Sequence, residues 1–168
     1  MTFLSTRKML CTSHHMGVCF FFMDNLYDTD FYTWTLEQAR LLREGRLSVL
    51  DIEHLAEEIE DMGKNRERAL ESQLERLLAH LLKWRYQPEE RVKREHSWRA
   101  SIEDARERIE DLLVKNPGLQ PHLAEIFPKA YPRGCRWAVS ETNLPNFTFP
   151  QECPWTLEQV LAPDFWPD

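Results

Sequence analysis

The stretch that decides the fold is residues 51–86, which read DIEHLAEEIEDMGKNRERALESQLERLLAHLLKWRY. Apolar residues recur there at helical spacing, which is typical of an amphipathic helix rather than a strand. Asp51 is expected to cap the first turn, because its carboxylate can accept from an otherwise unpaired backbone N–H. We expect one helix to continue through Gly63, where the phase of the apolar positions is unchanged, and to end before Pro88.

Three polar residues fall on the apolar face of this helix. Arg66, Gln73 and His80 are seven residues apart and therefore form one line along the helix, so we expect them to face the core or its rim. A polar group buried without a partner costs about 1–3 kcal/mol. Two interpretations follow: a structural seam that fixes helix register, or the lining of a polar pocket. The candidate catalytic residues are His80, Arg66, Gln73 and Glu58.

Two further helices are expected beside the long one. Residues 28–30 are suited to cap a first helix, which Gly45 would stop. After Pro88 a polar connection leads to Ser97, which we expect to cap a third helix ending at residues 116–118. Two long helices joined by a short connection should lie antiparallel.

The C-terminal part is rich in proline. A helical pattern starts near Leu119 and contains Pro128 and Pro132. Each interior proline costs about 3 kcal/mol, so this helix should be broken or kinked. Residues 144–154 predict an extended strap, and Thr156 begins a last short helix with a capping box. The predicted fold class is all-α: an irregular helical bundle built on a long antiparallel helix pair, with a proline-rich C-terminal strap and a short last helix.

The 168 residues fit a single domain, which we assign to residues 23–168. Residues 1–22 are expected to be a disordered extension, or to precede a true start at Met23. Their apolar run is too short for a signal peptide or a membrane span, so we expect a cytoplasmic protein without membrane contact. In that reducing compartment the cysteines should be free thiols: Cys11, Cys19, Cys135 and Cys153.

One region departs from the acidic composition of the chain. The net charge of −7 argues against strong non-specific binding to nucleic acid or anionic membranes. Between residues 83 and 99, however, six basic side chains outnumber three acidic ones, with Trp84 and Trp98 among them. Such a surface could bind an acidic protein or single-stranded nucleic acid; the alternative is that both tryptophans are core and the charges only solubilise a connection. We call this set the basic corner: Lys83, Arg85, Arg91, Lys93, Arg94 and Arg99.

The acidic start of the long helix is a candidate metal site. Glu57, Glu58 and Asp61 lie within about one turn, and His80 is a possible nitrogen ligand. The chain lacks the Glu-x-x-His pairs of helical di-metal bundles, and His80 lies ~28 Å along the helix from Asp61. The acidic run is therefore expected to be a solvated helix start that compensates the dipole. We predict neither metal nor cofactor.

Six segments of the chain form a recognisable pattern: LYDTDF at 26–31, LAEEIEDMG at 55–63, LLAHLLKWRYQP at 77–88, SWRASI at 97–102, ETNL at 141–144 and the segment 149–154. Together they resemble the bacterial family catalogued as domain of unknown function number twenty-nine. The resemblance covers roughly residues 26 to 167. It implies an all-helical fold and a start near Met23, and it implies no activity. Pro128 and Pro132 depart from the family pattern, which there is a continuous helix.

No motif in the chain specifies a reaction. Neither serine near the histidines has a nucleophile elbow around it, and there is no glycine-rich phosphate loop. The leading hypothesis is a cytoplasmic, non-catalytic binding or regulatory module that uses the basic corner. The alternative is an enzyme, such as a metal-dependent hydrolase, with a polar pocket around His80. Convergence of His80, Arg66 and Glu141 on one open cavity would favour the enzyme.

Overall fold

The computed structural model describes residues 26–168, and every regular element in that range is a helix. The all-α prediction is therefore confirmed. The described chain divides into two compact units, one up to Glu60 and the other Asp61–Asp168, and each is considered by itself. The expectations for residues 1–22, a start at Met23, Cys11 and Cys19 lie outside the described residues.

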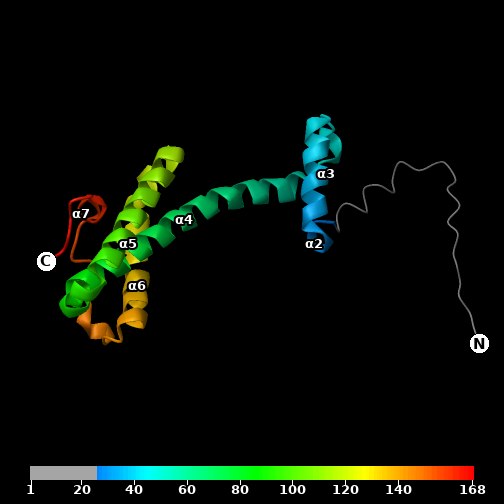
Figure 1. Ribbon diagram of the computed structural model, residues 1–168. Coiled ribbons are helices and arrows are strands. Elements are labelled where there is room, and N and C mark those ends of the chain that lie inside the picture. The colour runs from blue at the N-terminus through cyan, green and yellow to red at the C-terminus, as the bar shows by residue number, and fades with distance from the viewer. Residues whose placement is uncertain (1–25) are drawn as a thin grey trace, which may run out of the picture. The chain divides into compact units, whose positions relative to one another are not determined.

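The first unit is built around the N-cap of the long helix. It contains α2 (Leu26–Thr29), α3 (Phe31–Arg43), the 3-10 turn η1 (Leu47–Val49) and the first turns of α4 (Figure 1). Asp51 accepts from the backbone N–H of His54 at 3.3 Å, which confirms the predicted cap. From α3, Trp34 Nε1 donates to Asp51 Oδ2 at 3.1 Å, and Gln38 Oε1 accepts from the Asp51 N–H at 3.0 Å. The cap of one helix thus anchors the other.

The ends predicted for the first helix, which is α3, are also confirmed. Asp30 caps α3 by accepting from the N–H of Thr33 at 3.1 Å. Gly45 follows the helix with φ +69°, a left-handed conformation that glycine adopts without steric cost. Local capping chemistry therefore sets both ends of α3.

Helix α4 runs from Ile52 to Tyr86 without interruption at Gly63, as predicted. Only its second half is buried, with the core beginning at Leu70. Ile52, Ile59 and Met62 are 66–68% exposed, so the expectation that the apolar face of the helix is buried along its whole length is wrong. The apolar period continues over the whole of α4, but its buried residues begin only at Leu70.

Helix α5 (Pro88–Lys115) begins directly after Gln87, so the expected polar connection and the cap at Ser97 are both wrong. Proline is well suited to the first helical position, where no N–H is needed, and Glu89 and Glu90 favour the positive end of the dipole. Ser97 lies inside the helix. As predicted, α5 folds back along α4 (Figure 1), where Arg76 pairs with Asp104 at 2.7 Å.

Helix α6 (Leu123–Thr142) follows the 3-10 turn η2 (Pro117–His122) and includes both Pro128 and Pro132 without ending. Of the expected break or kink, the break does not occur. Two backbone hydrogen bonds are lost, but Ile126, Ala130 and Tyr131 are buried in the core of the second unit. Burial of this face compensates for the two prolines.

The C-terminal segment packs on the second unit as a strap. It contains the 3-10 turn η3 (Asn146–Thr148) and the short helix α7 (Leu157–Leu161). Tyr131 donates from its hydroxyl to the carbonyl of Pro150 at 2.9 Å. Thr156 and Gln159 form the predicted capping box. The residues that make up the core are Leu70, Leu74, Leu77, Leu78, Leu81, Leu82, Ile102, Ile109, Ile126, Ala130, Ala138, Phe149 and Val160, among others.

The closest approach of α6 to α4 depends on Gly134. A Cβ there would lie 3.0 Å from both the carbonyl oxygen of Glu75 and the Cβ of Leu78. We expect Gly134→Ala to lower the free energy of unfolding by about 1–2 kcal/mol through overpacking. Gly63→Ala is the matched control, because nothing lies within 4 Å of its Cβ position; it should stabilise the helix by up to ~1 kcal/mol. Denaturant midpoints of the two variants check this, and equal midpoints would contradict it.

Candidate functional site

A polar pocket of about 520 Å³ lies where α4 ends, α5 begins and α6 ends. At its wall the side chain of Lys83 is only 6% exposed, and its Nζ donates to Glu141 Oε2 at 2.5 Å. The same ammonium lies 5.5 Å from the centre of the Trp98 ring. The pocket therefore contains a buried cation with both a carboxylate and an indole as neighbours. Its lining is Lys83, Gln87, Glu90, Arg94, Trp98, Glu141 and Thr142.

Glu141 is held in its anionic form by two donors. Trp137 Nε1 donates to Oε1 at 2.7 Å, while Lys83 binds Oε2. Burial alone would raise the pKa of Glu141, but these hydrogen bonds outweigh burial and hold the pKa below its ordinary value. Because each carboxylate oxygen has two lone pairs, Glu141 can still accept from a ligand.

His80 lies one turn before Lys83 on α4 and is buried. Its Nδ1 lies 2.9 Å from the carbonyl oxygen of Arg76, so Nδ1 must carry the hydrogen and Nε2 the lone pair. Burial, and then the charge of Lys83, lower the pKa of His80. The ring meets Trp137 edge-on, with centroids 6.5 Å apart. His80 is thus a neutral histidine behind the wall of the pocket.

The protonation of His80 gives a testable pH dependence. His80→Ala is expected to cost about 1–3 kcal/mol at neutral pH, through a lost hydrogen bond and a small cavity. Because the folded-state pKa is lowered, the unfolded chain takes up the proton first as pH falls below about 6.5. The parent should therefore lose stability relative to His80→Gln between pH 7 and pH 5. Denaturation midpoints of both proteins across that range measure the difference, and parallel curves would contradict the assignment.

The other three candidate catalytic residues do not join His80. Arg66 is exposed, although it was expected to face the core or its rim, and it lies about 21 Å along the helix from His80. Gln73 is half-buried, and its Oε1 has no partner among the described residues. Glu58 belongs to the first unit, where it accepts from the hydroxyl of Tyr27 at 2.7 Å. None of the four residues lines the polar pocket.

The basic corner is divided by the fold. Of its six residues, only Lys83 and Arg94 line the polar pocket. Arg91 and Arg99 lie over the ring of Trp84, at 5.3 and 5.8 Å. Both Trp84 and Trp98 are buried, which confirms the alternative that they belong to the core. Neither ring is free to stack on a base.

Acidic neighbours on α5 further reduce the free charge of the basic corner. Lys93 pairs with Glu90 at 2.7 Å, and Arg94 lies at the longer distance of 3.5 Å from the same carboxylate. Arg99 lies 3.8 Å from Glu95. These are contacts between residues three or four positions apart on one helix, which are typical of a solvated face. Arg85 is exposed at the end of α4.

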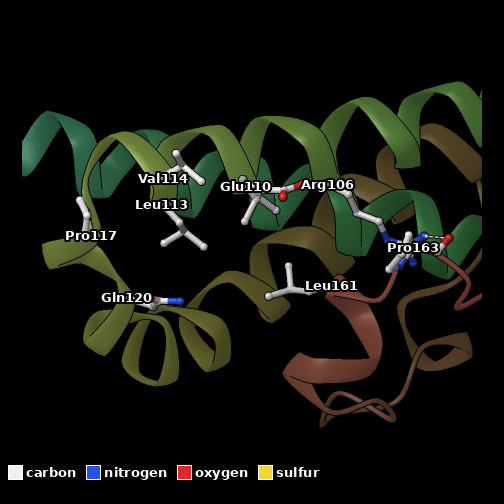
Figure 2. Close-up of a pocket in the computed structure, with 9 residues that line it drawn as sticks. Arg106, Glu110, Leu113, Val114, Pro117, Gln120, Leu161 and Pro163 are labelled. Atoms are coloured by element: carbon white, nitrogen blue, oxygen red, sulfur yellow. Dashed lines mark hydrogen bonds between the residues drawn. The ribbon is translucent and has the colours of Figure 1, made fainter.

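A second hollow of about 650 Å³ lies between the end of α5, η2 and the C-terminal segment. Figure 2 shows Leu113, Val114 and Leu161 around it, with Arg106 turned toward Pro163 at one end. Arg106 donates to the carbonyl oxygens of Val160, Pro163 and Phe165. Its guanidinium is therefore already hydrogen-bonded within the protein. This groove is apolar and offers few polar groups to orient a ligand.

The remaining reactive side chains form no second site. Within residues 26–168 no group of three or more His, Cys, Asp or Glu could hold a metal ion. Cys135 and Cys153 are free, and burial raises the pKa of both thiols, which disfavours the reactive thiolate. No helix in that range is long and apolar enough to cross a membrane.

The fold and the pocket together define an all-helical protein with a charged pocket at one helical corner. The chain belongs to the family described as domain of unknown function DUF29, whose pattern matches residues 26–166. No curated protein and no solved structure matches the chain. Three of the stretches that resemble the family, 77–88, 97–102 and 141–144, contribute residues to the polar pocket. Sequence analysis named Lys83 and Arg94 but missed Gln87, Glu90 and Thr142 as lining residues.

Proposed function

We propose that this chain is a cytoplasmic, non-catalytic binding module that holds a small zwitterionic ligand of the α-amino acid type in the polar pocket. One observation carries the proposal: the buried ammonium of Lys83 and the carboxylate of Glu141 lie together at the wall of a 520 Å³ pocket. Placing a charged pair there is costly unless it is well satisfied. The pair therefore offers a ligand one positive and one negative group at fixed positions in the pocket wall.

The remaining polar groups suit the two ends of such a ligand. The guanidinium of Arg94 is mostly exposed and only loosely paired with Glu90, so it can turn to a carboxylate. Glu90 and Glu141 provide acceptors for an ammonium group. The buried Trp98 contributes an apolar part of the pocket wall. Two cations and two anions favour a zwitterion over a simple anion.

An extended polyanion fits this surface less well. Glu90 and Glu141 would repel successive phosphates, and the tryptophans that could stack on bases are buried. Binding of an acidic protein or single-stranded nucleic acid would have to use the outer face of the basic corner, at Arg85, Arg91 and Lys93. That face is the competing location for the binding function.

A thermal unfolding screen tests the proposal. The probes are the common α-amino acids, with acetate and inorganic phosphate as simple anions and oligothymidylate as the polyanion. A ligand that binds only the folded state stabilises it by RT ln(1 + L/Kd), where L is the free ligand concentration, so the unfolding midpoint rises with ligand concentration. We expect at least one α-amino acid to raise it, and acetate and phosphate to leave it unchanged.

Two matched variants locate the binding site. Arg94→Ser should abolish the shift, because Arg94 lines the pocket. Arg91→Ser should retain it, because Arg91 belongs to the basic corner but lies outside the pocket. Absence of a shift with every amino acid would refute the ligand class. A midpoint raised by oligothymidylate and lost in Arg91→Ser would instead place the function on the outer face of the basic corner.

A further inference from the structure

The first turns of α4 carry an apolar surface without a partner among the described residues. Ile52 and Ile59 are 66% and 67% exposed, and Ala56 between them is exposed as well. Spacings of four and three residues place all three on one face of the helix. We call this face, Ile52, Ala56 and Ile59, the apolar stripe. It lies wholly within the first unit.

The opposite side of the same turns is already packed. The ring of Tyr27 stacks on His54 with centroids 3.9 Å apart, and its hydroxyl donates to Glu58 at 2.7 Å. Asp51 is held by Trp34 and Gln38. Because α2 and α3 already use this side, the first unit is anchored without the apolar stripe. Two large exposed isoleucines on one helix face, two turns apart with an exposed alanine between them, are typical of an interaction surface rather than of a solvated helix.

The surroundings of the apolar stripe are strongly acidic. Between Arg46 and Lys64 the chain has six Asp or Glu and no Lys or Arg. Glu53, Glu57 and Glu60 follow one edge of the stripe at helical spacing, and all three are exposed. The arginines among residues 26–60 follow α3 or lie just after it: Arg40 pairs with Glu37 and Glu44, Arg43 is in the last turn of α3, and Arg46 lies 3.7 Å from Glu44. The next basic residue along the helix, Lys64, pairs with Asp61 at 2.8 Å, so the excess of negative charge beside the stripe favours a cationic partner.

We infer that the apolar stripe docks an amphipathic helix of a partner protein whose polar face is basic. Helix-on-helix docking buries residues at the spacing that the stripe presents, and lysines beside the partner's apolar face would complement Glu53, Glu57 and Glu60. A second copy of this chain fits less well. A two-fold dimer through the stripe would place the same acidic edge on both sides of the contact. The inference is independent of the polar pocket, which lies in the second unit.

The test uses the full chain and a synthetic probe. The probe is a fluorescein-labelled peptide of leucine and lysine at helical spacing, about 18 residues long so that it can form a helix. Two controls share its length: one with glutamate in place of lysine, and one with the same residues scrambled so that no apolar face forms. Fluorescence anisotropy should show micromolar binding of the basic amphipathic peptide, weakened by salt. Neither control peptide should bind with comparable affinity.

Variants separate docking at the stripe from general attraction to an acidic protein. Ile52→Ser with Ile59→Ser should weaken binding at least tenfold. Val92→Ser with Val114→Ser is the matched control, since both valines are exposed on α5, and it should leave affinity unchanged. Glu53→Gln with Glu57→Gln should remove most of the salt dependence.

Three outcomes would overturn the inference. The first is equal binding of the basic peptide by the parent and the isoleucine variant. The second is equal binding of the scrambled peptide. The third is a dimer of the parent in sedimentation equilibrium that the isoleucine variant loses, which would make the occupant a second copy of this chain.

Discussion

Replacing Arg106 with lysine is expected to release the C-terminal segment from α5 and to lower the free energy of unfolding by about 2–4 kcal/mol. The guanidinium is buried and donates to three backbone carbonyls, those of Val160, Pro163 and Phe165, at 3.0, 3.2 and 2.8 Å. It also lies 5.4 Å from the centre of the Trp166 ring. One side chain therefore binds three backbone carbonyls of the C-terminal segment.

Lysine cannot replace this arrangement, although it retains the charge. A guanidinium presents its donors in a planar fork, whereas an ammonium is a single point on a flexible stem. Burial lowers the pKa of Arg106, but arginine remains charged in proteins; a buried lysine would be desolvated with fewer partners. At least one carbonyl would be left without a donor, at a cost of about 1–3 kcal/mol.

Urea denaturation and limited proteolysis measure the two parts of this expectation. Arg108→Lys is the control, because Arg108 is exposed and pairs with Asp104 four residues away on the same helix. It should change the free energy of unfolding by less than ~0.5 kcal/mol. Cleavage within residues 156–168 should accelerate only in Arg106→Lys. Identical midpoints and cleavage rates for the two variants would show that the C-terminal segment is held by its apolar contacts alone.

The features predicted correctly from the sequence are those set by nearby residues. The caps at Asp30, Asp51 and Thr156 each involve a side chain and a backbone N–H three residues away. The length of α4 follows from the periodicity of its own apolar positions. Such signals are local, so they survive any arrangement of the rest of the chain.

The wrong predictions arose where a local rule competed with packing. Pro88 was treated as the start of a connection, yet proline at the first helical position begins α5. Pro128 and Pro132 were expected to break α6, yet its buried face keeps the helix continuous. Ile52 and Ile59 fit the apolar period of α4, yet both side chains are exposed. Periodicity identifies the apolar face of a helix without showing how far its partners extend.

The pocket could be predicted only in part, because its main contact is between distant residues. Lys83 and Glu141 are 58 positions apart, and neither helical spacing nor composition pairs them. The excess of basic residues between 83 and 99 indicated a surface for an acidic partner, and two of those residues, Lys83 and Arg94, line the pocket. Arg106 gave no signal at all, since a charged residue in a polar stretch of α5 is expected to be solvated.

The pocket's ion pair should respond asymmetrically when its two members are replaced. We expect Glu141→Gln to lower the free energy of unfolding by about 2–3 kcal/mol, and Lys83→Met to change it by less than ~1 kcal/mol. The reason is the difference in exposure: Lys83 is 6% exposed and Glu141 is 43% exposed. A buried charge that loses its partner is strongly destabilised, whereas a half-exposed carboxylate keeps much of its hydration, which also limits the full effect.

The double variant and pH distinguish this cause from loss of packing. Lys83→Met combined with Glu141→Gln should recover most of the stability lost in Glu141→Gln, because no unpaired ammonium remains. Since the pKa of Glu141 is lowered in the folded protein from an ordinary value of 4.5, its contribution is complete above that value. The difference between the parent and Glu141→Gln should therefore shrink as pH falls below 4.5 toward the folded-state pKa. A difference that is constant with pH, together with additive effects in the double variant, would mean that Glu141 contributes through shape and that Lys83 does not need its charge.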